Sequence, residues 1–337
     1  MSRRRPLTHD LLRAPRMPER LWRARVRAAG WGAALFALVA SMAAALPASA
    51  NSDIATWPAG EERYVTYPSE QSLLPGGQHP LGVFLPAGWD PERAEPYPLL
   101  VLSHGAYDDQ TAWFDKGAAV TTLDRAMADG AIPATVVVTT SFENLTTAAM
   151  GELAFFDAYA EELRDAVLPF VESEFHVSAE RADRSFGGLS MGGALGLSIL
   201  KDHPDLFAHY GIWSAAADLG ADSVAVPSQQ ELERMGLAQS IHMGTGVDDE
   251  LEGIGARSQE RAVVYRDLGL PVTIHDIDGG HTWEVWQQQL EHFVHHGGIA
   301  AAEPQRRWGW IGVLILAMVG AGVAIAAVRR GSEIEQS

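Results

Sequence analysis

Short apolar runs alternate with longer amphipathic stretches through the middle of this chain, from residue 55 to residue 297. Several of the short runs are almost continuously apolar or β-branched, which is typical of strands buried on both faces of a sheet. Strands that alternate with helices pair in parallel, and their helices cover both faces. We therefore predict an α/β fold with a mostly parallel central sheet. The expected strands are 81–85, 99–102, 135–139, 209–213, 239–243 and 272–276. The expected helices are 118–129, 155–175, 193–202, 254–268 and 282–295, with Pro169 expected to kink or split the second.

The N-terminal end carries a long apolar segment that lies outside this pattern. Nine arginines fall within the first 27 residues, residues 28–46 carry no charge, and small residues occupy 47–50. This order predicts a secretory signal peptide, or an uncleaved membrane anchor, over residues 1–50. Both interpretations export the segment that follows. We therefore expect the domain at 51–300 to lie outside the cytoplasm.

The C-terminal end carries a second apolar segment. Residues 308–328 have no charge, begin with a Trp-Gly-Trp sequence and are followed by an arginine pair. A stretch of this length can cross a bilayer as a helix. We therefore expect a linker at 301–307, a transmembrane helix at 308–328 and a short cytoplasmic tail at 329–337. The arginine-rich N-terminus orients the chain with its domain on the extracytoplasmic side of the cell membrane.

Composition excludes several classes of function. Without the two ends, 14 basic residues face 39 acidic ones, so the domain repels nucleic acid and anionic lipid surfaces. The chain has no cysteine, which excludes disulfides, zinc–thiolate sites and thiol nucleophiles. His292 and His296 are four residues apart on an expected helix, but no further ligand stands at a suitable spacing. We expect neither a metal nor a cofactor.

One serine lies among four glycines in the segment GGLSMGG, residues 187–193. Gly188-x-Ser190-x-Gly192 matches the nucleophile-elbow pattern, and it stands between a short strand candidate and a helical pattern, as that motif requires. Glycines fit there because a sharply turned serine leaves no room for neighbouring side chains. The following helix would direct its positive end at the reacting centre. A glycine-rich packing turn without chemistry is the alternative.

A nucleophilic serine requires a base, and the base requires an acid that orients it. His281 follows an expected strand and precedes an expected helix, while the adjacent acids of 248–250 follow another strand. The chain order of serine, acid and histidine is the order of the α/β-hydrolases. The backbone N–H groups of Ala106, after the strand at 99–102, and of Met191 could hold an oxyanion.

From about residue 60 to residue 297 the chain resembles the "Putative esterase" family of α/β-hydrolases. This family includes esterase D, feruloyl esterases, enterochelin esterases and the antigen 85 mycolyltransferases. The resemblance rests on five segments in this order: PLLVLSHGAYDDQTAWF, ELRDAVLPFVESEFHVSAER, GGLSMGGALGLSILKDHPDLFAHYGIWSAA, GTGVDDELEGIG and GGHTWEVW. It implies an α/β-hydrolase fold, with Ser190 as nucleophile, His281 as base and Asp249 as acid. Asp248 is the second choice for the acid.

The resemblance also implies an oxyanion N–H at Ala106 and an aromatic side chain, Trp283, beside the site. We take His104 and Trp283 as candidate residues of the substrate pocket. The segment before the elbow is more polar than is usual, so we expect a short strand there. Residues 140–151 and 215–238 match no subfamily pattern, and 215–238 show no clear period, which leaves the substrate open.

These observations predict an extracytoplasmic, membrane-tethered serine esterase that hydrolyses carboxylic esters through an acyl-serine intermediate. Its partners would be a small-molecule, lipid or glycan ester and the membrane, through the C-terminal helix. Two alternatives stay open. One is an acyltransferase acting on cell-envelope glycolipids, as in the mycolyltransferases. The other is a non-catalytic binding domain on a hydrolase fold.

Overall fold

The computed structural model describes a large part of the chain, all of it within the unit Ser49–Ser337: residues 60, 62–68, 78–142, 153–218 and 223–300. The expected signal or anchor at 1–50, the linker at 301–307, the transmembrane helix at 308–328 and the tail at 329–337 lie outside the described residues. Among the helices within these ranges, none combines the length and apolar character that crossing a membrane requires.

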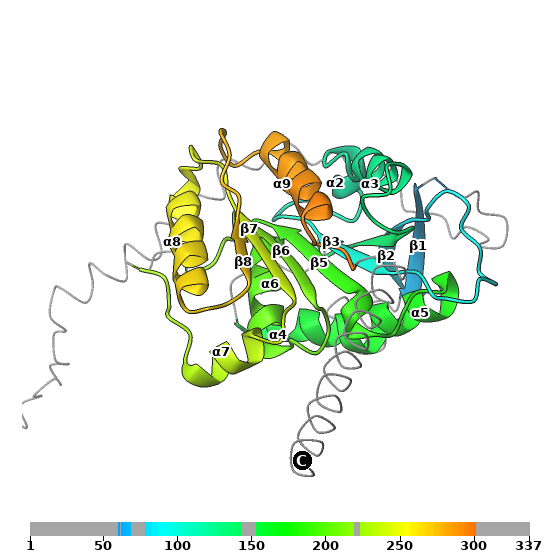
Figure 1. Cartoon of the computed structure of the whole chain (residues 1–337), viewed down its shortest axis with the longest axis horizontal. Helices are drawn as coiled ribbons and strands as arrows, with labels where there is room; N and C mark the ends of the chain where they lie inside the picture. Colours follow the sequence, from blue (N-terminus) through cyan, green and yellow to red (C-terminus); the bar gives the residue numbers. More distant parts are fainter. Residues whose placement is uncertain (1–59, 61, 69–77, 143–152, 219–222, 301–337) are drawn as a thin grey trace, which may run out of the picture. The chain divides into compact units, whose positions relative to one another are not determined.

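Eight strands of the described residues form one sheet in the order β1-β2-β4-β3-β5-β6-β7-β8 (Figure 1). β1 pairs with β2 and β2 with β4 in antiparallel fashion, and every other neighbouring pair is parallel. The mostly parallel sheet is therefore confirmed. The strands are β1 (Glu62–Pro68), β2 (Gln78–Phe84), β3 (Leu99–Ser103), β4 (Val136–Thr140), β5 (Arg184–Leu189), β6 (His209–Trp213), β7 (Ser240–Gly244) and β8 (Val272–Ile274).

β1 is the strand that the sequence did not predict. Its buried positions, Val65 and Tyr67, alternate with more exposed residues. Our strand predictions relied on continuous apolar runs, whereas an edge strand half-exposed to solvent needs only this alternation. The omission therefore concerns the antiparallel edge of the sheet and not its parallel centre.

The strand before the elbow is longer than expected. β5 has six residues, and every one of them is buried. Its polar first residue, Arg184, is tolerated because its guanidinium forms an ion pair with Glu172 and its Nε donates to the carbonyl of Ser178 at 3.3 Å. Pairing with β3 on one side and β6 on the other holds the remaining backbone.

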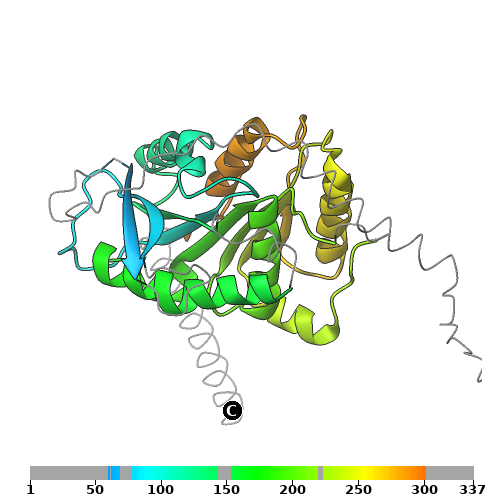
Figure 2. The same ribbon diagram turned by 180° about the vertical axis from the view of Figure 1, so that it is seen from behind.

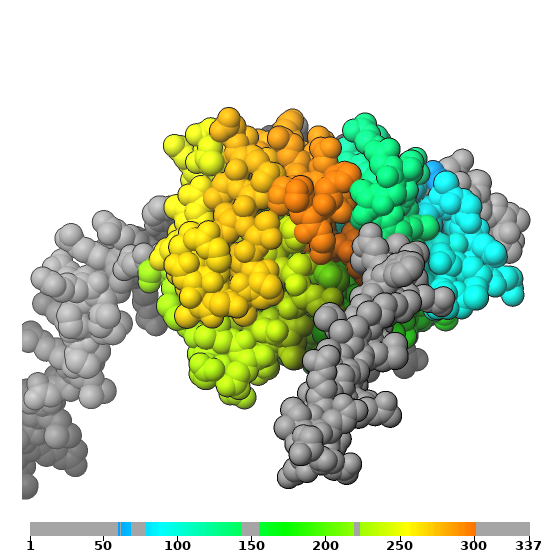
Figure 3. Space-filling view, viewed as in Figure 1, coloured from blue at the N-terminus to red at the C-terminus, as the bar shows by residue number. Residues whose placement is uncertain are grey.

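Helices cover both faces of the sheet, as predicted (Figures 1 and 2). One face carries α2 (Ala112–Asp115), α3 (Ala119–Ala128) and α9 (Trp283–His295). The other carries α4 (Leu153–Glu162), the π-helical turn η2 (Leu163–Val167), α5 (Leu168–Phe175), α6 (Met191–Asp202), α7 (Gln229–Met235) and α8 (Ile254–Asp267). The described residues also form two 3₁₀ turns, η3 (Arg181–Asp183) and η4 (Leu251–Gly253). In the space-filling view, α9 lies between the surfaces of α8 and of the α2–α3 segment (Figure 3).

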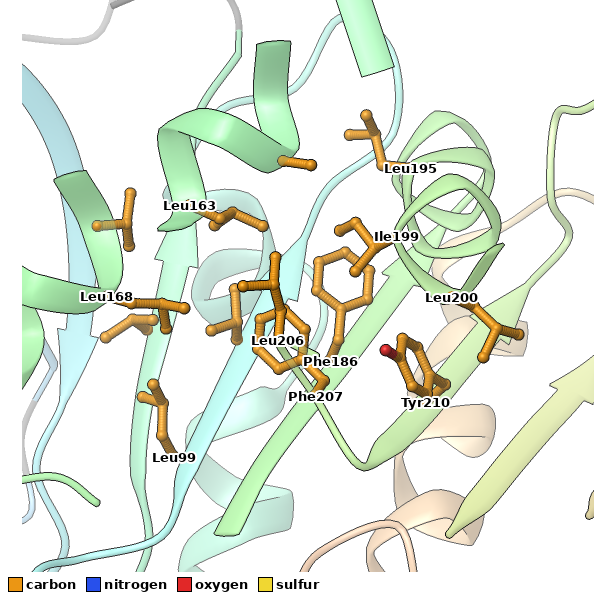
Figure 4. Packing of buried hydrophobic residues seen from close by; sticks show 14 of the residues in the cluster. Leu99, Leu163, Leu168, Phe186, Leu195, Ile199, Leu200, Leu206, Phe207 and Tyr210 are labelled. Carbon is orange, nitrogen blue, oxygen red and sulfur yellow. The ribbon is translucent and has the colours of Figure 1, made fainter. Parts of the chain in front are cut away.

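The larger core lies between the sheet and the α4–α6 layer (Figure 4). Side chains of η2, α5 and α6 meet side chains of the central strands there, and the residues labelled in the figure are all buried. They are Leu99, Leu163, Leu168, Phe186, Leu195, Ile199, Leu200, Leu206, Phe207 and Tyr210. Close packing of this kind fixes β5 and α6 against each other, and the turn between them is the GGLSMGG segment.

Two local predictions are refined by the structure. The expected interruption of the 155–175 helix is present, but it takes the form of the π-helical turn η2 just before Pro169. Proline lacks an N–H and crowds the carbonyl four residues earlier, and the wider turn relieves both. Residues 215–238, where no period was seen, contain α7. Ser228 caps α7 with a capping box, since its hydroxyl accepts from the N–H of Glu231 and the Glu231 carboxylate accepts from the N–H of Ser228.

Candidate active site

Ser190 occupies a strained backbone position between β5 and α6. Its φ of 52° and ψ of −113° lie in a region that residues with a side chain rarely adopt. A Cβ added to Gly188 would lie 2.2 Å from the carbonyl oxygen of Gly192, and one added to Gly192 would lie 2.5 Å from the carbonyl oxygen of His104. The glycines of the elbow are therefore required by backbone contacts on both sides of the serine.

The hydroxyl of Ser190 contacts His281, and His281 contacts Asp249. The distance from Ser190 Oγ to His281 Nε2 is 3.0 Å, and that from His281 Nδ1 to Asp249 Oδ2 is 2.8 Å. The Asp249 side chain is fully buried and the imidazole is 15% exposed. Asp248, the second choice for the acid, is exposed to solvent. The structure thus brings the three expected residues into one hydrogen-bonded line.

These side chains meet because each follows a parallel strand, and the carboxyl ends of parallel strands share one edge of the sheet. Ser190 follows β5, Asp249 follows β7, and His281 follows β8 and precedes α9. Two backbone hydrogen bonds join the acid loop to the base loop, from Val247 N to Ile277 O at 2.8 Å and from Asp248 N to Gly279 O at 2.9 Å. The spacing of acid and base is therefore set by backbone.

The loop after β3 lies against the serine. A Cβ added to Gly105 would lie 3.3 Å from the Cβ of Ser190. Neither the N–H of Ala106, which follows Gly105, nor that of Met191, the first residue of α6, has an acceptor among the described residues. One of these amides follows Gly105, which lies against the serine, and the other is at a helix N-terminus, where the backbone favours negative charge.

His104 is buried at 1% exposure, beneath the loop that carries Ala106. Its ring stacks on Phe142 with centroids 3.9 Å apart, and its Nδ1 is 2.6 Å from the carbonyl oxygen of Gly105. Burial lowers the pKa of His104 to about 4, so the imidazole is neutral at pH 7 and Nδ1–H donates to that carbonyl. This contact supports the loop; the side chain does not face solvent.

Trp283 is half-buried at the start of α9, within a set of edge-to-face rings. Its ring is 5.3 Å from that of Trp113 and 5.3 Å from that of Trp286. Trp286 in turn packs edge-on to the imidazole of His281, with centroids 4.9 Å apart. Trp286 therefore lies between Trp283 and His281. The assignment of Trp283 to the substrate pocket stays a prediction.

Thr245 and Asp276 contact the acid loop, although neither stands out in the sequence. Thr245 Oγ1 donates to Asp249 Oδ2 at 3.3 Å, and Leu251 N donates to Asp249 Oδ1 at 3.3 Å. The N–H of Thr245 donates to Asp276 Oδ1 at 3.1 Å, and burial raises the pKa of Asp276. Thr245 directly follows β7, so its place at the carboxyl edge of the sheet was the available signal.

Histidines gather at the other end of α9. The rings of His275, His292 and His296 form a stack, which we call the histidine stack, with successive centroids 3.8 and 3.9 Å apart. His242 of β7 meets His292 at 5.7 Å. In the ranges that the structure describes, no group of three or more histidine, aspartate or glutamate side chains could hold a metal ion. Burial first, and the neighbouring imidazoles second, lower the pKa of His242 to about 4.

A hydroxyl bound to an imidazole, with a buried carboxylate on the other ring nitrogen, is the arrangement that makes an alcohol nucleophilic. The carboxylate fixes the tautomer in which Nε2 can take the hydroxyl proton. Amides flanking the hydroxyl can stabilise an oxyanion that forms when it attacks a carbonyl. The described geometry therefore suits acyl transfer.

Comparisons with known proteins point to the same class of chemistry as the geometry of the site. The family model described as "Putative esterase" matches residues 72–296. An endo-1,4-beta-xylanase/feruloyl esterase of Xylanibacter ruminicola is 28% identical over 240 residues, which cover 69% of this chain and 30% of that relative. The chain thus spans less than a third of the length of this relative.

Solved structures share the fold. A ferulic acid esterase superimposes with a TM-score of 0.60 at 22% identity, over 70% of this chain and 96% of the other. A fluorophosphonate-binding serine hydrolase of Staphylococcus aureus superimposes with a TM-score of 0.54 at 18% identity, over 71% of this chain and 98% of the other. The sheet and its helical layers are those of the α/β-hydrolase fold.

Proposed function

Because the chain belongs to the "Putative esterase" family, we propose that it is a serine esterase that hydrolyses carboxylic esters through an acyl-serine intermediate. The observation that carries this proposal is the hydrogen-bonded line from Ser190 through His281 to the buried Asp249. The strain at Ser190 adds support, because unfavourable backbone conformations concentrate at functional sites.

The reaction we propose has two halves. Ser190 Oγ attacks the ester carbonyl while His281 Nε2 takes its proton, and the amides of Ala106 and Met191 hold the oxyanion. The protonated imidazole then gives its proton to the leaving alcohol, which departs and leaves the acyl group on Ser190. In the second half water attacks the acyl carbonyl, His281 takes and returns the proton, and the carboxylic acid is released. The carboxylate of Asp249 stabilises the imidazolium that forms in each half.

The first substrate class to examine is esters of aromatic acids. This choice rests on the name of the Xylanibacter ruminicola relative and on the solved ferulic acid esterase. The ring of Trp286 packs on His281 and that of Trp283 packs on Trp286, and apolar surroundings of this kind are consistent with an apolar acyl group. Short-chain aliphatic esters and lipid esters complete the panel, because the region that shapes the pocket matches no subfamily pattern.

The proposal is tested with a fluorophosphonate probe and a panel of p-nitrophenyl, feruloyl and lipid esters on the full chain. We expect the wild type to label and to hydrolyse at least one ester, and Ser190→Ala to do neither. Ser185→Ala is the matched control, because Ser185 is a buried serine of β5, the strand that precedes Ser190, and its hydroxyl has no partner among the described residues. A wild type that neither labels nor hydrolyses would support a non-catalytic binding domain instead.

The same assay separates hydrolysis from acyl transfer. An added sugar acceptor that receives most of the acyl group, at the expense of the free acid, would favour the acyltransferase. If the acid yield stays unchanged over a wide range of acceptor concentration, the enzyme transfers to water. The difference depends only on which alcohol or water reaches the acyl-serine.

We further propose that the domain is exported and tethered to the cell membrane by the apolar segment at 308–328, following a signal or anchor at 1–50. The support is the length and charge pattern of these segments. Fractionation of cells expressing the full chain should place it with membranes, and external protease should digest the domain in intact cells. A variant ending at residue 305 should leave the membrane fraction once the N-terminal segment is cleaved.

A further inference from the structure

A chain of buried hydroxyls lies behind the proposed acid. Thr245 Oγ1 is 3.3 Å from Asp249 Oδ2, the same oxygen that faces His281. Ser214 Oγ is 3.1 Å from Thr245 Oγ1, and Trp286 Nε1 is 3.2 Å from Ser214 Oγ. Ser214 and Thr245 are fully buried, and Trp286 is 6% exposed. The residues come from the ends of β6 and β7 and from α9 (Figure 1).

The donor and the acceptor of each hydrogen bond in this series of buried groups follow from the chemistry of the groups. An indole N–H only donates, so Trp286 donates to Ser214. An ionised carboxylate only accepts, so Thr245 donates its single hydroxyl proton to Asp249. Ser214 must then donate to Thr245. The three dipoles point the same way, toward the carboxylate, and bonds aligned in this manner polarise one another.

Both ends of this series of hydrogen bonds contact His281. Trp286, the first donor, packs edge-on to the imidazole at 4.9 Å, and Asp249, the last acceptor, is hydrogen-bonded to His281 Nδ1. The turn at Ser214 is held by its own N–H, which donates to Gly244 O at 2.9 Å. The neighbouring Trp213 carbonyl accepts from the N–H of Ser190 at 2.9 Å. Backbone and side-chain contacts of this one turn therefore reach all three proposed catalytic residues.

We propose that Thr245 is a positioning residue of the esterase: as the last donor of the Trp286–Ser214–Thr245 chain, it holds the Asp249 carboxylate in the orientation that fixes His281. The proposal rests on the esterase function proposed above. Thr245 touches neither Ser190 nor the substrate carbonyl in this scheme. It acts through Asp249, because a carboxylate with one oxygen bound to two donors has little freedom to rotate away from the imidazole.

The role predicts a specific change in kinetics. In Thr245→Val a methyl group of similar size replaces the hydroxyl, so Asp249 loses its donor and Ser214 loses its acceptor. We expect kcat to fall about tenfold with little change in KM, at the low end for hydrogen bonds to charged groups because 3.3 Å is long for such a bond. The unshared carboxylate charge stabilises the imidazolium more strongly, so the acid limb of the kcat/KM profile should move to higher pH.

The experiment compares Thr245→Val, Thr245→Ser and Ser214→Ala with the wild type, in the full chain. Thr245→Ser keeps the hydroxyl and should restore kcat to within about threefold of the wild type, an expectation that follows from retaining the donor. Ser214→Ala keeps the donor to Asp249 but removes its polarising neighbour and the acceptor of Trp286 Nε1. Its loss of kcat should be smaller than that of Thr245→Val, because the hydrogen bond to Asp249 remains. Circular dichroism and melting temperature report whether each variant is folded.

The possible outcomes distinguish this proposal from the one on which it rests. If the wild type neither binds the fluorophosphonate nor hydrolyses esters, the esterase function fails. If the wild type is active and folded Thr245→Val equals it in kcat and pH profile, the positioning role is wrong. The role is also wrong if Thr245→Ser is as impaired as Thr245→Val, since the hydroxyl would then be irrelevant. Should Thr245→Val not fold, Thr245→Ala takes its place, and a folded Thr245→Ala that equals the wild type in kcat and pH profile overturns the proposal.

Discussion

Acid should destabilise this protein through His242, which lies beside the histidine stack. Burial and the imidazoles of His292, His296 and His209 lower the pKa of His242 from 6.5 to about 4. The unfolded chain therefore binds a proton between these two values that the folded chain does not bind. Stability is complete above about pH 6.5 and is lost as the pH falls toward 4. The pKa of His292 is lowered in the same direction, so the two effects reinforce each other.

The magnitude follows from the shift. Each pKa unit corresponds to about 1.4 kcal/mol, so protonation linked to His242 lowers the free energy of unfolding by about 2 kcal/mol at pH 5 and about 3 kcal/mol below pH 4. A domain of this kind typically has about 5–15 kcal/mol in all, so the loss is large enough to measure.

The assay is equilibrium urea denaturation at pH 7.5 and pH 5, followed by tryptophan fluorescence. The variant His242→Gln cannot be protonated and should show a drop between the two pH values that is about 2 kcal/mol smaller than that of the wild type. His295→Gln is the matched control, because His295 is exposed on the same helix as His292. A wild type whose free energy of unfolding is equal at the two pH values, or a His242→Gln variant with an undiminished drop, would show that the reasoning is wrong.

Two further predictions concern the site. Gly188→Ala places a Cβ 2.2 Å from the carbonyl oxygen of Gly192, so the elbow must shift and the rate of hydrolysis should fall by about 100-fold or more. Gly280→Ala should stay active, because the nearest contact of its added Cβ is at 3.6 Å. Equal rates for these two variants would contradict the steric argument. Asp249→Asn should lower kcat by about 10⁴-fold, because the amide favours the wrong imidazole tautomer. Asp248→Asn should leave kcat near the wild-type value, because Asp248 is exposed. Steady-state kinetics measures both values of kcat, and the reverse ranking would assign the acid to Asp248.

The centre of the sheet could be predicted from sequence because its strands are buried on both faces. Continuous apolar runs such as the one in Leu99–Ser103 are typical of strands in that position. β1 was missed because one of its faces is partly exposed, and β5 was expected to be short because the segment before the elbow, which includes Arg184, is more polar than is usual for a buried strand. The ion pair that satisfies Arg184 comes from Glu172, on another element, and no local pattern reveals it.

Part of the site could likewise be predicted from sequence and part could not. The positions of Ser190 and His281 follow from the motif and from the order of residues along the chain, both of which can be read from the sequence. The preference for Asp249 over Asp248 came from a resemblance, and the burial of one carboxylate and exposure of the other is a tertiary fact. The contact of Thr245 with Trp286 through Ser214 joins residues 72 positions apart along the chain at its longest step. Such a contact cannot be predicted from the sequence before the order of the strands in the sheet is known.

The distance along the chain between Ser190 and His281 has a consequence for biosynthesis. The two residues are 91 positions apart, and Trp286, which packs on the imidazole, comes later still. At roughly 5–20 residues per second, a ribosome needs about 5–20 s to pass from the serine to the histidine. During this interval the nascent chain carries the elbow serine without its base. In the mechanism that we propose, Ser190 therefore becomes a nucleophile only after His281 has been made and its loop has docked.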